Sequence, residues 1–154
     1  MSSEAPHGPT PGYLVWRLST KWRVAVDRAL APLGLTHAQY ALLSSLYGMR
    51  RAGLHPSQRE LADHTGLEAL YVSKLARALE ADGLVGRVRD ARDSRAVRLT
   101  LTESGQEAVR PAMATVQDLM DRLLAPLGGR DDSRTAALVR DLTALLDAPL
   151  EPPY

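Results

Sequence analysis

Residues 58–75 read QRELADHTGLEALYVSKL, and this stretch decides the fold. A helix-turn-helix needs a small residue where its two helices cross, a glycine at the turn, and an aliphatic residue that fixes the second helix. Ala62, Gly66 and Val72 occupy these positions at the right spacing. Gly66 suits the turn because glycine accepts a positive φ without a Cβ clash. The segment predicts a helix-turn-helix, and an ordinary helical hairpin is the alternative.

The residues around this core predict where its two helices begin and end. Ser57 and Glu60 have the spacing of a capping box, which starts a short helix that ends near Thr65. The second helix is expected over residues 68–82, with Val72, Leu75 and Leu79 on its buried face. Gly83 follows as a left-handed C-terminal stop.

After Gly83 the hydrophobic period changes from 3.6 to 2, which predicts two strands over 84–89 and 97–101 joined by residues 90–94. A helix-turn-helix followed directly by a two-stranded wing is a winged helix. An arginine-rich hairpin by itself is usually a solvated surface, but beside a recognition helix it favours contact with DNA. The wing region carries five arginines against Asp90 and Asp93: Arg87, Arg89, Arg92, Arg95 and Arg98.

The flanking segments predict a mostly α fold with a small β-hairpin. Residues 1–12, rich in Pro, Gly and Ser, are expected to be a disordered arm, and 13–35 a first dimerisation helix. Residues 36–105 form the predicted DNA-binding lobe, 106–148 two further dimerisation helices, and 149–154 a tail. Pro111 either kinks the long helix or indicates that this helix starts later.

Composition excludes several classes of protein. Without cysteine the chain has no disulfide, thiolate zinc site or thiol redox sensor. No run of about 18 apolar residues predicts a membrane span, and the N-terminus lacks the apolar core of a signal peptide, so the cytoplasm is the expected compartment. The sequence has no phosphate-binding glycine loop, no nucleophile elbow and no His-x-x-x-His pair. We therefore expect no catalytic residues, no metal and no cofactor.

The spacing from the turn glycine through the wing resembles the MarR family of bacterial transcription regulators. The residues that carry this resemblance, within the matching region 36–108, are Gly66-Leu67, Val72-Ser73-Lys74, Leu79-Glu80, Gly83-Leu84-Val85, Arg92-Asp93-Ser94-Arg95 and the run from Leu99 to Gly105. The resemblance implies a homodimer whose terminal helices hold two DNA-reading lobes apart. It also implies repression by occupancy of a promoter, often relieved by small anionic or phenolic ligands.

Eleven residues are expected to face DNA. The second helix is expected to bury Val72, Leu75 and Leu79. Its opposite face then presents Lys74 and Arg77 to guanine edges or phosphates. The apolar side chains of Leu70 and Tyr71 on that face could contact thymine methyl groups. Tyr71 has packing beneath the wing as its alternative. Asp93 is expected to hold the Arg95 guanidinium for a narrow minor groove, or to form only a hairpin ion pair. The set is Ser57, Gln58, Leu70, Tyr71, Ser73, Lys74, Arg77, Arg89, Arg92, Asp93 and Arg95.

The terminal helices predict a dimer and a ligand site. Apolar stripes along 119–127 and 138–146 exceed what one small lobe can cover, which predicts a homodimer on an inverted-repeat operator. A small aromatic carboxylate or phenol is the candidate effector, although Trp16 and Tyr40 could be core residues and His37 a surface residue. The candidate ligand residues are Tyr13, Trp16, Arg17, His37, Tyr40 and Met113.

The rival function is a winged helix that contacts only protein.

Overall fold

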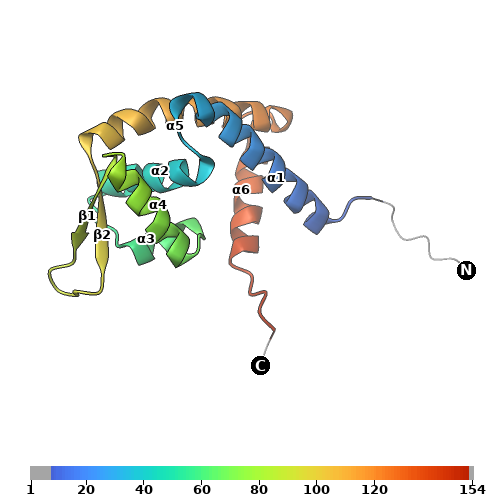
Figure 1. Ribbon diagram of the computed structural model, residues 1–154. Coiled ribbons are helices and arrows are strands. Elements are labelled where there is room, and N and C mark those ends of the chain that lie inside the picture. Colours follow the sequence, from blue (N-terminus) through green and yellow to red (C-terminus); the bar gives the residue numbers. More distant parts are fainter. Residues whose placement is uncertain (1–7, 153–154) are drawn as a thin grey trace, which may run out of the picture. The chain divides into compact units, whose positions relative to one another are not determined.

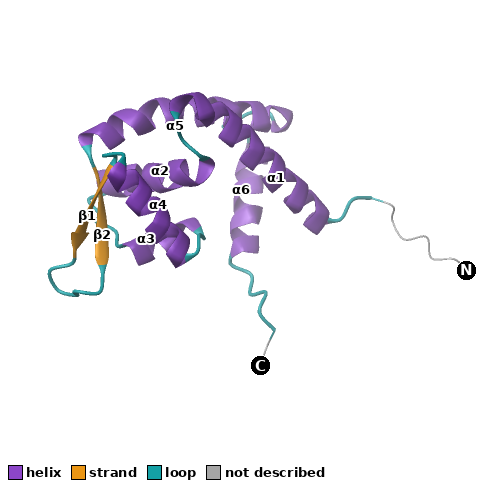
Figure 2. Ribbon diagram, in the orientation of Figure 1, coloured by secondary structure: helices purple, strands orange, loops and turns teal. Residues whose placement is uncertain are grey.

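The computed structural model describes residues 8–152, which form helices and one antiparallel two-stranded sheet (Figures 1 and 2). The predicted mostly α fold with a β-hairpin is confirmed. The chain divides into two compact units, one up to Thr115 and one from Val116 onward. The elements are α1 (Pro11–Leu30), the 3-10 helix η1 (Ala31–Leu33), α2 (His37–Arg51), α3 (Gln58–Thr65), α4 (Ala69–Ala81), β1 (Val85–Arg89), β2 (Val97–Leu101), α5 (Glu103–Leu124), the 3-10 helix η2 (Ala125–Leu127) and α6 (Ser133–Leu146).

Aliphatic side chains from α2, α3, α4 and β2 form the core of the first unit. Leu42 and Leu43 of α2 are fully buried together with Leu61, Leu79 and Leu99. Because these leucines come from four different elements, the shared core fixes the helix-turn-helix and the hairpin as one body. Burial of each such side chain is worth about 1.5–3 kcal/mol, which makes this cluster the principal stabilising contact of the lobe.

Side-chain caps begin the helices of the lobe. Thr36 and Gln39 form a complete capping box: the Thr36 hydroxyl accepts from the Gln39 N–H at 3.2 Å, and the Gln39 side chain accepts from the Thr36 N–H at 3.0 Å. The capping box predicted at Ser57 is only half present. Its hydroxyl accepts from the Glu60 N–H at 3.1 Å, but the Glu60 carboxylate lies 3.8 Å from the Arg98 guanidinium instead of reaching back to the cap.

One predicted boundary is wrong. Helix α1 begins at Pro11, because the Thr10 hydroxyl accepts from the Tyr13 N–H at 3.2 Å and caps it, so the expected arm cannot extend to residue 12. Residues 1–7 of that arm lie outside the described residues. The boundary placed between 105 and 106 falls inside α5, which is continuous across it and across Pro111. A later helix start at Pro111 is therefore excluded, since α5 already begins at Glu103.

The C-terminal end of the chain agrees with the predicted tail as far as it is described. Helix α6 ends at Leu146, and residues 149–152 form no helix or strand. Residues 153–154 of the predicted tail lie outside the described residues. The last helix begins as expected from its acidic N-terminal residues, because the Asp132 carboxylate caps it by accepting from the Arg134 N–H at 2.8 Å.

Candidate nucleic-acid interface

Helices α3 and α4 meet across a tight glycine turn. Gly66 ends α3 in the left-handed region, with φ of 73°, and its N–H donates to the Ala62 carbonyl at 2.9 Å. Ala62 and Val72 are both buried at the helix crossing. The three residues that predict the helix-turn-helix therefore occupy the roles assigned to them, and the turn leaves the N-terminal half of α4 at the surface.

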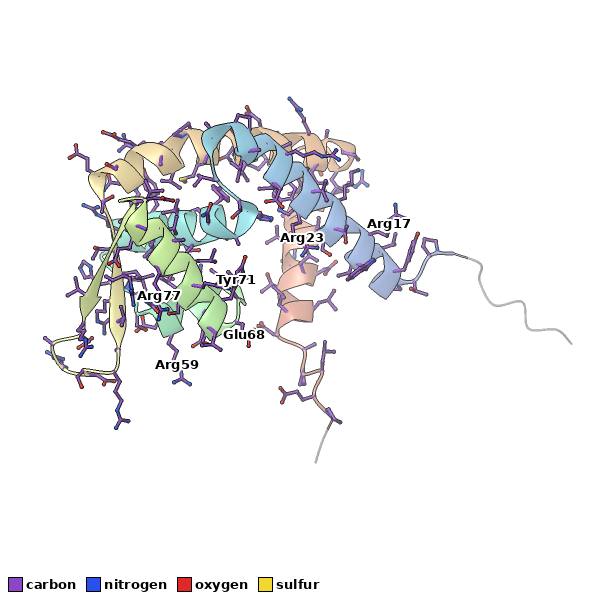
Figure 3. The ribbon with its side chains drawn as sticks, viewed as in Figure 1. Arg17, Arg23, Arg59, Glu68, Tyr71 and Arg77 are labelled. Carbon is purple, nitrogen blue, oxygen red and sulfur yellow. The ribbon has the colours of Figure 1, made fainter. Side chains whose placement is uncertain are left out.

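The face of α4 opposite the core is exposed, as expected. Leu70 is 79% exposed, Lys74 and Arg77 are exposed, and Ser73 is half-buried. Tyr71 is 43% exposed, so its ring is not buried beneath the wing (Figure 3). Among the described residues, neither Lys74 nor Arg77 takes part in an ion pair within 4 Å. Their positive charges are available to a ligand.

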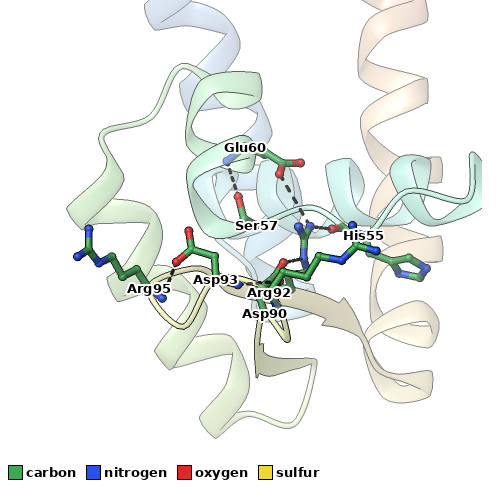
Figure 4. Close-up of polar contacts among 8 residues, drawn as sticks. His55, Ser57, Glu60, Asp90, Arg92, Asp93 and Arg95 are labelled. Carbon is green, nitrogen blue, oxygen red and sulfur yellow. Dashed lines mark hydrogen bonds and ion pairs between the residues drawn. The ribbon is translucent and has the colours of Figure 1, made fainter.

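Asp90 organises the tip of the wing (Figure 4). Its carboxylate accepts from the backbone N–H groups of Arg92, at 2.7 Å, and Asp93, at 3.2 Å, and it also accepts from the Arg98 guanidinium. The Arg92 N–H, the Arg98 side chain and the Asp93 N–H together hold the pKa of Asp90 below its ordinary value. The carboxylate thus remains ionised and closes the loop between β1 and β2.

Arg98 ties the wing to the segment before α3. Its guanidinium donates to the His55 carbonyl as well as to the Asp90 carboxylate. In the same place the Leu99 N–H donates to the Pro56 carbonyl at 3.0 Å, and Ser57 forms an isolated β-bridge with Arg98. These contacts fix the angle between the wing and the start of α3.

The predicted pairing of Asp93 with the Arg95 guanidinium does not form. The Asp93 carboxylate accepts instead from the backbone N–H of Arg95 at 3.0 Å, because the two residues lie in a turn that brings this N–H to the carboxylate. Figure 4 shows the Arg95 side chain extending away from the loop. Asp93 therefore shapes the loop backbone, and the Arg95 guanidinium forms no ion pair with a described residue.

A groove of about 970 Å³ lies between the start of α3 and the wing. It brings together four of the predicted DNA-facing residues, namely Ser57, Gln58, Asp93 and Arg95. The Gln58 Nε2 atom is buried and has no hydrogen-bond partner in the described part of the chain. The other predicted residues lie outside this groove, on the exposed face of α4 or, for Arg89 and Arg92, on the exposed wing.

Comparison with known proteins identifies the type of protein. The MarR family model matches residues 33–96, which include the helix-turn-helix, the first strand of the wing and the loop that follows it. An uncharacterised HTH-type transcriptional regulator of Bacillus subtilis is 36% identical over 110 residues, 71% of this chain and 75% of that protein. The chain belongs to the MarR family.

Two further relatives support this assignment. An HTH-type transcriptional repressor of Mycobacterium tuberculosis is 34% identical over 116 residues, 75% of this chain and 81% of that protein. The crystal structure of a Staphylococcus aureus MepR–DNA complex has a TM-score of 0.75 and 26% identity, covering 89% of this chain and 94% of that one. The predicted DNA-binding transcription regulator of the MarR family is thereby confirmed.

A hollow of about 550 Å³ along α1 of this MarR-family chain is lined by Arg17 and by none of the other five candidate ligand residues. Tyr13, Trp16 and Arg17 are exposed on α1, with Trp16 67% exposed, so Trp16 is not a core residue of the described chain. Tyr40 is half-buried, and burial raises its pKa. His37 is half-buried, and burial lowers its pKa although Asp27 opposes this. Met113 is half-buried as well, and the ligand site stays a prediction.

Sequence reasoning left Asp90 and Arg98 out of the site. The charges of Asp90 and Arg98 neutralise each other, and each of the two side chains also hydrogen-bonds backbone groups. The available signal was the position of Asp90 at the start of a hairpin loop, where Asp commonly bonds backbone N–H groups two and three residues ahead. Across the described residues, no cluster of three His, Asp or Glu side chains could hold a metal ion, and no helix is long and apolar enough to cross a membrane.

The wing tip should depend on the charge of Asp90. We expect Asp90→Asn to speed hydrogen exchange at the Arg92 and Asp93 amides, because an amide oxygen is a weaker acceptor than a carboxylate. In the unmodified protein the ionised Asp90 carboxylate stabilises the loop. This stabilisation is fully present above the unfolded pKa of Asp90, about 3.9, and is lost as pH falls through its lower folded pKa. Amide chemical shifts followed by NMR from pH 6 downward measure this titration.

Asp93→Asn is the matched control, since among the described residues the Asp93 carboxylate accepts only from the Arg95 N–H. It should change exchange at Arg95 and leave the Arg92 amide as it is. Unchanged exchange at Arg92 in Asp90→Asn would contradict the role given to Asp90.

Proposed function

We propose that this chain represses transcription as a homodimer that binds an inverted repeat in duplex DNA. The observation that carries the proposal is the set of unpaired cations on the two elements that a winged helix presents to DNA. Lys74 and Arg77 lie on the exposed face of α4, and Arg89, Arg92 and Arg95 lie on the exposed wing. Helix α4 would occupy the major groove, and the wing would contact the backbone or minor groove.

The wing divides its arginines between structure and surface. The Arg87 Nη1 atom lies 3.6 Å from the Glu80 Oε1 atom of α4, and the Arg98 guanidinium binds the Asp90 carboxylate. The other three form no ion pair among the described residues. Because an uncompensated cluster of cations repels itself, a polyanion that neutralises it gains both attraction and relief of repulsion. This favours DNA over a neutral protein surface as the partner.

The relatives support repression as the mode of action. The Mycobacterium tuberculosis relative is a transcriptional repressor, and MepR has been solved bound to DNA. We assign no catalytic activity to the chain, since the relatives that match it are transcription regulators. The cytoplasm is the proposed compartment because the DNA target lies there.

DNA affinity should fall when Arg95 is removed. We expect Arg95→Ala to weaken operator binding by about 1–3 kcal/mol, the scale of a groove or charge-assisted contact. Half-site centres should lie about 10–11 base pairs apart, one turn of the duplex. Fluorescence anisotropy with a promoter fragment from upstream of its own gene, measured across salt concentrations, provides both the affinity and the number of phosphates neutralised.

The matched control is Arg110→Ala, which removes an exposed arginine that lies two turns into α5 and outside the groove. It should retain the affinity of the unmodified chain. Operator binding by Arg95→Ala equal to that of Arg110→Ala would contradict the wing assignment. Absence of salt-dependent DNA binding would favour the rival function, a module that contacts protein.

Exposed apolar side chains on α6 and α1 support the homodimer. On α6, Val139 is 57% exposed, Leu145 63% and Leu146 87%. On α1, Leu14 is 50% exposed and Trp16 67%. Such concentrations of large apolar groups usually form an interface, because their exposure to water is unfavourable. Two copies of one chain related by a two-fold axis would match the two-fold symmetry of an inverted repeat.

Dimerisation should be sensitive to charge on α6. We expect Leu145→Glu to weaken the dimer at least about tenfold, since burial of an unpaired carboxylate costs several kcal/mol. Leu70→Glu is the control, because it adds the same charge at an exposed leucine of α4. Sedimentation equilibrium at micromolar concentration measures both. A monomeric parent, or equal association of both variants, would count against this interface.

An effector that releases DNA is the second part of the proposal. On α1 the Arg17 guanidinium donates to the Tyr13 hydroxyl at 2.9 Å and lies 5.7 Å from the centre of its ring, with Trp16 exposed beside them. A cation among exposed aromatic rings suits a small aromatic carboxylate or phenol. For such a ligand to release DNA, it must bind the free protein more tightly than the DNA complex.

Reciprocity gives the test of the effector. We expect salicylate to bind the free dimer more tightly than the DNA-bound dimer, by the same factor by which it weakens DNA binding. Tryptophan fluorescence follows both titrations, and Arg17→Gln should weaken the binding of salicylate in each. Equal salicylate affinities for the free and DNA-bound protein would refute release by this ligand.

A further inference from the structure

Another hollow of the first unit lies between the C-terminal end of α2 and the first turns of α5. Its volume is about 340 Å³, and its lining residues are Tyr47, Arg50, Arg51, Gln106 and Arg110. It shares no residue with the groove beside the wing or with the six candidate ligand residues. Every group that lines it offers a hydrogen-bond donor, and three of the five are guanidinium groups.

The three arginines are not neutralised by the protein. None of them forms an ion pair within 4 Å in the part of the chain that the structure describes. Arg50 is held in place by a hydrogen bond of 2.9 Å from its Nη1 to the Leu101 carbonyl, at the end of β2. Three like charges around one hollow repel one another, and this repulsion is relieved when an anion binds.

Tyr47 connects two of these arginines. The guanidinium carbon of Arg51 lies 5.9 Å from the centre of the Tyr47 ring. The neighbouring Arg51 and Arg110 guanidinium groups lower the pKa of the Tyr47 hydroxyl. A phenol that ionises more readily reports a positive potential at its oxygen. The Tyr47 side chain and the two guanidinium groups therefore line one hollow, although they come from two helices.

The helix dipole accounts for only part of this cluster. Arg50 and Arg51 belong to the last turn of α2, where cations interact favourably with the negative end of the helix. Arg110 lies two turns inside α5, far from that helix's C-terminal end, so the dipole gives no reason for a cation there. Arg110 lines the same hollow as Arg51, and this points to a shared anionic ligand.

We propose that this hollow binds the phosphate group of a small molecule. A phosphate dianion offers three oxygens and two charges to the guanidinium forks, whereas a carboxylate offers two oxygens and one charge. The DNA backbone is a poor fit because Arg50 anchors the hollow to the base of the wing. The wing tip lies at the opposite end of the hairpin (Figure 1), about 15 Å away for a strand of five residues.

Calorimetric titration of the full-length chain with inorganic phosphate, at constant ionic strength set by chloride, tests the proposal. The double variant Arg51→Gln/Arg110→Gln should bind phosphate at least about tenfold more weakly, since one charge-assisted hydrogen bond corresponds to about that factor. The control Arg89→Gln/Arg95→Gln removes the same charge from the wing and should keep phosphate affinity. All four residues are exposed, and thermal unfolding in chloride checks that both variants are folded.

Three further arms identify the source of the anion. Phenyl phosphate should bind at least as tightly as inorganic phosphate, and acetate should bind more weakly. Operator affinity should be unchanged in Arg51→Gln/Arg110→Gln and reduced in the wing variant. Phosphate affinity lost only in the wing variant would overturn the proposal. Tighter binding of acetate, or DNA affinity lost in the pocket variant, would overturn it in favour of a carboxylate or of the DNA backbone.

Tyr47 provides a spectroscopic signal for phosphate binding. If the arginines of this hollow had only a structural role, phosphate would leave that signal unchanged. The difference in tyrosinate absorbance between the unmodified chain and Tyr47→Phe isolates the titration of Tyr47. We expect its pKa to lie below the ordinary value of about 10, and to rise when phosphate binds or when Arg51 becomes Gln. A pKa for Tyr47 that phosphate leaves unchanged would contradict binding in this hollow.

Discussion

The geometry of the DNA-binding lobe depends on the pairing of Arg98 with Asp90. One guanidinium joins the loop of the wing, through the Asp90 carboxylate, to the segment before α3, through the His55 carbonyl. The Asp90 carboxylate in turn holds two backbone N–H groups of that loop. A flexible hairpin would lose conformational entropy on binding DNA, and this pairing removes much of that loss in advance.

The same pairing explains how one hairpin carries structural and surface arginines side by side. Arg87 and Arg98 are engaged by Glu80 and Asp90, whose charges compensate them. Arg95 has the Asp93 carboxylate nearby, but that carboxylate binds its backbone N–H and leaves the guanidinium unpaired. The acidic residues of the wing therefore leave the Arg95 charge available to DNA, because their carboxylates hydrogen-bond the backbone of the loop.

Apolar surface is distributed in a way that a single chain does not explain. The core of the lobe buries Leu42, Leu43 and Leu99 to 1% exposure or less, whereas α6 leaves Leu145 and Leu146 more than half exposed. Both kinds of leucine have the helical or strand periodicity that normally indicates a core. A second copy of the chain supplies the missing cover in our proposal, and the same assembly would place two recognition helices on one duplex.

The sequence by itself determined the helix-turn-helix, the wing and the exposed face of α4. These features follow from local rules, since a left-handed turn at Gly66 requires glycine and the burial of Val72 and Leu79 fixes which side of α4 faces solvent. Tertiary structure alone decided which charges are paired. Asp90 and Arg98 meet across the hairpin, and Tyr47 and Arg110 line one hollow although their helices are distant in sequence. Charge pairing depends on distances between side chains in space, and hydrophobic periodicity contains no information about them.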